Sequence, residues 1–158
     1  MDICIFSGYF NPIHPGHISL IQDIRSKYPK CKLIAIVNND KQVGLKGAVP
    51  FMDEKTRLYI VQNIKGVDEA VLSIDQDQAV VESLELIKYD KRHRNSIICF
   101  CNGGDRSPTS SAIPEVRFCI ANNIYLEYGF GDDKTYSSSQ ILQKAYSWLH
   151  SHHFNTLL

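Results

Sequence analysis

The stretch ICIFSGYFNPIHPGH, residues 3–17, runs from an apolar segment through a short loop into a helix start, and it decides the fold. Residues 2–7 have the composition of a buried strand. Over residues 15–27, Ile18, Ile21 and Ile24 recur every three residues, which is typical of a helix. Pro15 suits the first helical turn, because an N–H group there has no partner within the helix. A strand that leads through a glycine-containing loop into a helix is the opening of a β-α-β unit.

The same alternation continues along the chain. We expect four further strands, at residues 31–37, 69–74, 97–101 and 124–128, and four further helices, at 53–64, 78–88, 113–122 and 138–150. A polar loop is expected at 38–49, and a solvated basic turn at 91–94. The pattern predicts an α/β fold: a single Rossmann-like domain whose five-stranded parallel sheet has helices on both faces. We expect the domain to span residues 1–150, followed by a loosely held tail at 151–158.

Composition excludes several classes of protein. The 158 residues are 44% hydrophobic, and 17 basic residues balance 17 acidic ones, which fits one globular domain with no charge excess for binding nucleic acid or a membrane surface. No apolar run reaches the ~18 residues of a membrane helix, and the start of the chain lacks the pattern of a secretory signal. The 5 cysteines form no CxxC pair, so we expect reduced core residues and a cytoplasmic protein.

The loop after the first predicted strand holds the most unusual residues. In a parallel sheet, ligands bind beyond the carboxyl ends of the strands, where the strand order reverses. His14 and His17 are three residues apart, so both rings can face one side of a helix start whose free N–H groups favour anions. Gly16 lets a ligand approach the backbone. This geometry predicts a phosphate site, although two histidines alone are also compatible with a structural capping pair or half of a metal site.

Six positions of this loop match the pattern Gly-x-Phe-(Asp/Asn)-x-x-His-x-Gly-His: Gly8, Phe10, Asn11, His14, Gly16 and His17. The chain therefore resembles the cytidylyltransferase-like nucleotidyltransferase superfamily, which includes glycerol-3-phosphate cytidylyltransferases and heptose-phosphate adenylyltransferases. Further family motifs are matched in order by Lys46-Gly47, by Arg57 and the following Lys65-Gly66-Val67-Asp68-Glu69-Ala70, by Asn102-Gly103-Gly104-Asp105-Arg106, and by Ser137-Ser138-Ser139-Gln140-Ile141. Alone, these pieces read as solvated residues, an ordinary turn and a helix N-cap.

The resemblance implies a reaction in which the phosphate of an acceptor attacks the α-phosphate of a nucleoside triphosphate and releases pyrophosphate. It implies catalytic roles for His14 and His17 as donors to the triphosphate and for Lys46 in offsetting charge. The nucleotide-binding residues that it implies are Gly8, Tyr9, Phe10, Asn11, Gly16, Arg57, Lys65, Asn102, Gly103, Gly104, Asp105, Arg106, Ser137, Ser138 and Ser139. Among these, Arg57 is expected near the phosphates, and Lys65 and residues 102–106 on the ribose and base side. Mg²⁺ bound mainly through substrate phosphates and a homodimer are also implied.

The identity of the substrates is less constrained. Asp132-Asp133-Lys134 stands where glycerol-3-phosphate cytidylyltransferases carry an arginine, and other motifs are closer to the heptose-phosphate adenylyltransferases. We expect CTP as the donor and a small phosphorylated alcohol or sugar as the acceptor, with ATP as the alternative donor. Residues 44–51 and 107–111 are candidate loops for acceptor specificity. A nucleotide-binding module without catalysis is the alternative from a different class.

Overall fold

The computed structural model describes residues 1–103, 113–131 and 137–151. Its five strands are β1 (Ile3–Gly8), β2 (Lys32–Val37), β3 (Glu69–Leu72), β4 (Ile98–Gly103) and β5 (Tyr125–Phe130). They form one parallel sheet in the order β3-β2-β1-β4-β5. The chain moves outward from β1 to β3 and then returns to the other side of β1. The strand order therefore reverses between β1 and β4, and the loops after these strands flank the usual ligand position.

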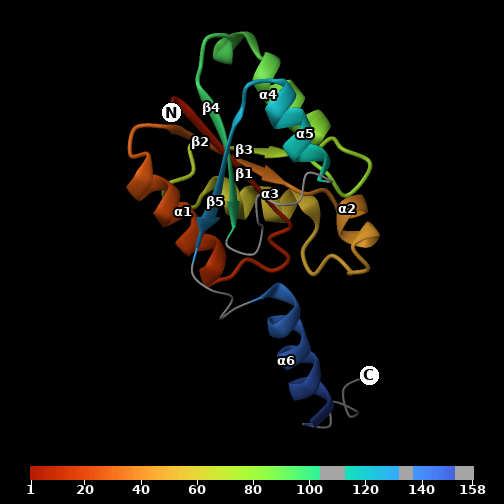
Figure 1. The fold of residues 1–158 in the computed structure, drawn as a ribbon. Coiled ribbons are helices and arrows are strands. Elements are labelled where there is room, and N and C mark those ends of the chain that lie inside the picture. The colour runs from red at the N-terminus through yellow and green to blue at the C-terminus, as the bar shows by residue number, and fades with distance from the viewer. Residues whose placement is uncertain (104–112, 132–136, 152–158) are drawn as a thin grey trace.

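The helices are α1 (Pro15–Lys27), α2 (Asp40–Leu45), α3 (Glu54–Gln62), α4 (Val81–Tyr89), α5 (Pro114–Ala121) and α6 (Ser138–Ser151), with a 3-10 turn at Lys91–His93. Helices cover both faces of the sheet (Figure 1). Residues of α1 and α3 share one buried cluster with one face, and residues of α4 and α5 share a second cluster with the other. The predicted α/β fold class with a five-stranded parallel sheet is confirmed.

The sheet is built from nearly continuous apolar runs because both of its faces are covered. In β2, Leu33, Ala35 and Val37 pack toward α1 and α3, while Ile34 and Ile36 pack toward α4 and α5. The five cysteines are free and buried, as the sequence predicted. Strand boundaries differ from the predicted ones by at most two residues.

Two predictions for the region after β2 are wrong. The expected loop at 38–49 contains helix α2, which starts at the N-cap Asn39 and buries Gln42 and Val43. The expected helix at 78–88 begins later, at Val81. The Gln42 side chain explains this shift, because its amide donates to the carbonyl oxygens of Asp77 and Ala79 and holds that segment outside the helix.

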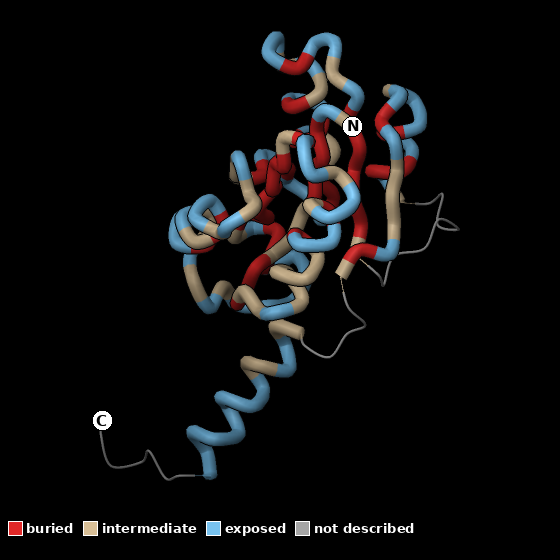
Figure 2. The backbone as a smooth tube through the Cα atoms, turned by 90° about the vertical axis from the view of Figure 1, so that its left-hand side faces the viewer, coloured by how far each residue is buried: buried red, intermediate tan, exposed pale blue. Residues whose placement is uncertain are grey.

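Helix α6 extends away from the rest of the domain (Figures 1 and 2). None of its residues is buried, and Tyr146, Trp148 and Leu149 are exposed. Its first turn lies close to the loop after β1, because the Ser138 hydroxyl donates to the Pro12 carbonyl oxygen over 2.8 Å. Of the expected tail at 151–158, Ser151 is the last residue of α6 and the remainder lies outside the described residues.

Candidate functional site

The loop after β1 is shaped around the ring of Phe10. This residue has a left-handed φ of 50°, and its buried ring meets Phe6 edge-on with a centroid separation of 6.1 Å. A Cβ atom on Gly8 would lie only 2.8 Å from Phe10 Cζ, so a larger residue at position 8 would displace the ring. The ring centroid of His17 is 4.8 Å from that of Phe10. Gly8 and Phe10 therefore form the support behind His17.

His14 and His17 come together at the start of α1, as their spacing predicted. Their ring centroids are 3.8 Å apart, and the backbone N–H of His14 donates to His17 Nδ1 over 3.2 Å. This bond fixes the tautomer, because a neutral His17 whose Nδ1 accepts must carry its proton on Nε2. Burial, with smaller effects from the charges of His14 and Lys46, lowers the pKa of His17 to about 3. Burial also lowers the pKa of His14, so both rings are neutral donors at pH 7.

His14 Nδ1 is a buried polar atom without a hydrogen-bond partner in the described part of the chain. Leaving such an atom unpaired costs free energy, so most buried polar atoms in native proteins have a partner. His14 is also the N-cap of α1, where backbone N–H groups favour an anion. Both features suit the binding of a polar ligand at this helix start.

The low pKa of His17 predicts a pH-dependent stability. The unfolded chain takes up a proton on this residue near pH 6.5, whereas the folded protein resists it down to about pH 3. The neutral His17 ring therefore makes its full contribution to the free energy of unfolding above about pH 6.5, and this contribution is lost as the pH falls toward 3. Urea unfolding at pH 7, 6, 5 and 4 is expected to show a shallower fall in stability for His17→Gln than for the wild type. Parallel curves for the two proteins would contradict the pKa assignment.

Lys46 is placed by helix α2, the element that the sequence did not predict. It is the C-cap of α2, and its Nζ lies 4.4 Å from the centroid of the Tyr9 ring. Its positive charge is close enough to contribute to the lowered pKa of His17. The structure therefore brings Lys46, Tyr9 and the histidine pair together.

Asn11 was expected to contact a nucleotide, and in the structure its side chain bonds to the backbone of the segment after α2. It is buried, its Nδ2 donates to the Val49 carbonyl oxygen over 3.0 Å, and its Oδ1 accepts from the Phe51 N–H over 2.7 Å. Both ends of the amide are thus bound to the backbone of the segment after α2. Asn11 ties that segment to the loop after β1 and the start of α1, residues 9–17, which we call the histidine loop.

Arg57 was expected near the phosphates, but its side chain is fully buried. Its guanidinium donates to the carbonyl oxygens of Tyr9, Asn38 and Met52 over 2.6 to 3.1 Å. It also forms a 2.7 Å ion pair with Asp40. Arg57 therefore joins the loop after β1, the end of β2 and the starts of α2 and α3, and it acts on the site through these contacts.

The start of α6 meets the same loop. Ser137 Oγ accepts from the Gln140 N–H over 3.2 Å, which confirms the predicted capping interaction, and Ser137 and Ser139 share a 3.1 Å hydroxyl contact. Together with the bond from Ser138 to Pro12, these contacts bring a second helix N-terminus beside the start of α1. Two helix N-termini near one loop favour a ligand with several anionic groups.

The remaining predicted residues are divided between two ends of the sheet. Gly16 lies in the first turn of α1, where Gly131 packs against its carbonyl group, and Asn102 and Gly103 end β4 beside β1. Gly104, Asp105 and Arg106 lie outside the described residues. Lys65 is not brought to the site, because it is exposed in the connection from α3 to the amino end of β3. The predicted helix at 53–64 and strand at 69–74 already place Lys65 ahead of a strand, at the amino end of the sheet, so the expectation rested on the motif match alone.

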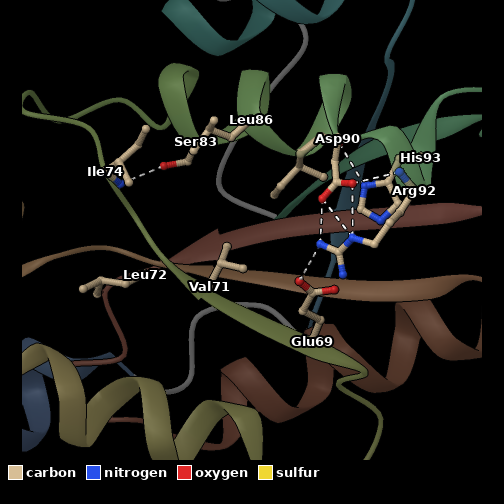
Figure 3. Close-up of a pocket in the computed structure, with 10 residues that line it drawn as sticks. Glu69, Val71, Leu72, Ile74, Ser83, Leu86, Asp90, Arg92 and His93 are labelled. Carbon is tan, nitrogen blue, oxygen red and sulfur yellow. Dashed lines mark hydrogen bonds and ion pairs between the residues drawn. The ribbon is translucent and has the colours of Figure 1, made fainter.

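A separate cavity of about 130 Å³ lies between β3 and α4 (Figure 3). Its charged side chains satisfy one another, because Arg92 pairs with Asp90 and Glu69. His93 at its end is buried, with Nδ1 2.9 Å from the Ile87 carbonyl oxygen. The predicted solvated turn at 91–94 is therefore partly packed. Beside His14 and His17, in contrast, Lys46 forms no ion pair within the described part of the chain.

Neither a metal centre nor a membrane span is found in the described parts of the chain. Residues 1–103, 113–131 and 137–151 contain no group of three or more metal-binding side chains. Within the same residues, no helix is both long and apolar enough to cross a bilayer.

Comparison with known proteins defines the family. The cytidylyltransferase-like family model matches residues 5–122, so the chain belongs to this family and the predicted resemblance is confirmed. Among its relatives, the FAD synthase of Thermoplasma acidophilum is 37% identical over 78 residues, covering 48% of this chain and 54% of the relative. The FAD synthase of Methanothermus fervidus is 36% identical over 85 residues, covering 53% and 57%. The chain thus spans about half the length of the curated relatives it matches.

A solved structure supports the fold. The lipopolysaccharide core biosynthesis protein of Thermoplasma volcanium has a TM-score of 0.61 against this chain, with 21% sequence identity. The match covers 83% of this chain and 98% of that protein. At this identity, the likeness establishes the architecture alone.

Proposed function

We propose that this protein is a nucleotidyltransferase, which moves the nucleotidyl group of a nucleoside triphosphate to a small phosphorylated acceptor and releases pyrophosphate. The observation that carries the proposal is the neutral histidine pair at the start of α1, with Lys46 alongside. The His14 Nδ1 atom of this pair has no hydrogen-bond partner among the residues that the structure describes. The start of α6 adds a second set of backbone N–H groups beside it. Neutral donors, the ammonium group of Lys46 and two helix N-termini suit a polyphosphate chain.

The proposed chemistry is direct in-line attack by an acceptor phosphate oxygen on the α-phosphorus, with pyrophosphate as the leaving group. Negative charge grows on the leaving oxygen, and donors held in place stabilise it without reorganising. His17 would donate through Nε2, because its Nδ1 already accepts from the backbone. Lys46 would lower the repulsion between the acceptor phosphate and the α-phosphate. Ser137 to Ser139 would hold the β- and γ-phosphates, and no covalent intermediate on the protein is required.

We propose ATP as the donor and FMN as the acceptor. The supporting observation is that the curated relatives are named FAD synthases. FAD is FMN joined through its phosphate to an adenylyl group, so its formation from FMN is an adenylyl transfer. This proposal replaces the expected CTP with the alternative donor, ATP, and it keeps a phosphorylated acceptor, with FMN in place of a small alcohol or sugar phosphate.

Pyrophosphate release tests both substrates. The wild type is to be assayed with ATP or CTP, each paired with FMN or glycerol 3-phosphate. Release with ATP and FMN alone is the expected result. Release with CTP instead would restore the cytidylyltransferase prediction. Nucleotide binding without release from any pair would contradict the proposed activity and favour a non-catalytic binding module.

Mg²⁺ is proposed to bind through the substrate phosphates, with few ligands from the protein. The described residues fit this mode, because the histidine pair and the start of α1 offer donors that would hold the substrate phosphates. When bound, the ion would offset the negative charge of the substrate phosphates. The single-domain organisation over residues 1–150 and a cytoplasmic location also stay proposals, and the five buried free cysteines support a reducing compartment.

A homodimer is proposed on the basis of helix α6. Its sequence SSQILQKAYSWLHS has one residue that is fully charged at neutral pH, Lys144, and it exposes Tyr146, Trp148 and Leu149. An exposed apolar face with so little charge is expected to be covered in an assembly. Sedimentation of the wild type is expected to give a dimer, and Trp148→Glu is expected to shift it toward monomer. The matched control is Lys144→Gln, and a wild type that sediments as a monomer would contradict the proposal.

A further inference from the structure

The segment between α2 and α3 exposes an unusual set of apolar side chains. Leu45 is 47% exposed, Val49 80% and Phe51 63%. Single exposed apolar residues are common in folded proteins and need no explanation. Here three of them lie within seven residues, in the segment that also contains Lys46. Clustered exposed apolar side chains of this kind mark binding surfaces.

This segment is fixed to the histidine loop rather than merely near it. Asn11 holds it twice, through the Val49 carbonyl oxygen and the Phe51 N–H. Its start is closed by the bonds from the Gly47 N–H to the Gly44 carbonyl and from the Ala48 N–H to the Val43 carbonyl. The backbone is therefore held in place while the side chains of Val49 and Phe51 stay exposed. A held backbone that presents apolar side chains can bind a ring system with little loss of conformational freedom.

The charge pattern of the segment points to one kind of ligand. Lys46 offers an ammonium group, and the side chains that follow it at Val49 and Phe51 are apolar. A sugar phosphate or a short polyol phosphate would bring hydroxyl groups against this surface, and these would lose their water without gaining partners. A phosphate linked through a chain to a flat ring system would place its charge near Lys46 and an apolar ring face against Val49 and Phe51.

We infer that Val49 and Phe51 form the contact surface for a planar aromatic ring in the acceptor, whose phosphate lies toward Lys46. This inference rests on the proposed function and narrows its acceptor class. The isoalloxazine ring of FMN is such a ring and is joined to the phosphate through a ribityl chain. Stacking of the ring face on Phe51 would make position 51 a determinant of acceptor choice.

The test is a titration of FMN fluorescence against the wild type, Phe51→Ala, Phe51→Trp and Tyr59→Ala. Tyr59 is the matched control, because it is an aromatic residue on α3 that is 71% exposed. Stacking on one aromatic side chain is typically worth about a tenfold change in affinity. Phe51→Ala is therefore expected to weaken FMN binding about tenfold. Phe51→Trp and Tyr59→Ala are expected to stay near the wild type, and ATP binding is expected to be unchanged in all of the proteins.

Two results would overturn the inference: no FMN binding by the wild type, or FMN binding by Phe51→Ala that equals that of the wild type. If equal binding came with a change in the sedimentation of Phe51→Ala, this surface would be a contact between protein copies. Pyrophosphate release separates this test from that of the proposed function. FMN binding that depends on Phe51 but yields no pyrophosphate contradicts the activity alone. Pyrophosphate release from ATP and FMN with an unchanged KM for FMN in Phe51→Ala contradicts the ring surface alone.

Discussion

Replacing His17 with alanine is expected to lower turnover by roughly 10²- to 10³-fold, the usual cost of removing one fixed donor to a developing charge. The reason lies in the tautomer. The His14 N–H occupies Nδ1, so Nε2 carries the proton of the neutral ring and can donate it to a phosphate oxygen. The fold is expected to persist, because the Phe10 ring that supports His17 packs independently on Phe6. The measurement is the steady-state rate of pyrophosphate release, with circular dichroism to verify folding.

The matched control for this variant is His150→Ala. His150 is exposed on α6, and its ring centroid lies 3.9 Å from that of Tyr146. Its replacement removes a stacked imidazole away from the histidine loop. Its turnover is expected to equal that of the wild type. A folded His17→Ala protein with near-normal turnover would contradict the role given to the histidine pair.

Arg57→Met is expected to destabilise the protein by about 3 to 5 kcal/mol, because it removes a buried guanidinium that donates to several backbone acceptors and to Asp40. The buried guanidinium serves three backbone carbonyl oxygens and Asp40, and methionine would leave these acceptors without a donor. Because Tyr9 and the start of α2 are held by the same group, turnover should also fall in whatever fraction remains folded. Urea unfolding at pH 7 measures the change in stability.

Lys55→Met is the control for Arg57→Met, because it removes a positive charge from an exposed position on the same helix. Its stability is expected to stay within about 0.5 kcal/mol of the wild type. Arg57→Lys is expected to restore only part of the loss, since an ammonium group cannot reproduce the planar fork of donors. Equal unfolding midpoints for Arg57→Met and the wild type would show that the buried network contributes nothing.

The strands and the histidine loop were predictable because their signals are local. The run from Lys32 to Val37 is apolar on both faces, which is typical of a strand covered on both sides. His14 and His17 are three residues apart at a helix start, so the turn of the helix itself brings them together. Local spacing was enough for both.

Helix α2 was not predictable by the same means. Its six residues include Gly44, and its two buried residues, Gln42 and Val43, are adjacent and so show no helical period. The helix is held instead by the Asn39 cap and by bonds from Gln42 to residues 35 and 37 positions away. Helix α2 is therefore determined by contacts between segments that are distant in the sequence, and the periodicity of its own six residues does not predict it.

The same limit applies to Asn11 and Arg57. Both lie within family motifs, and a motif match alone cannot tell a residue that contacts a ligand from one that holds a loop. Asn11 reaches residues 38 and 40 positions away, and Arg57 reaches Tyr9, 48 positions away. Only the folded arrangement shows that the donors of these side chains point into the protein.

Isotope transfer tests the central claim most directly, because nucleotidyl transfer differs from other phosphate chemistry in which phosphorus moves. The wild type is to be incubated with FMN and ATP labelled either on the α-phosphate or on the γ-phosphate. The account predicts that the α-label appears in the flavin product and the γ-label in released pyrophosphate, with both transfers lost in His17→Ala. The account would be contradicted by a γ-label in the flavin. It would also be contradicted by an α-label that is released as AMP, and not found in the flavin product, while pyrophosphate is formed.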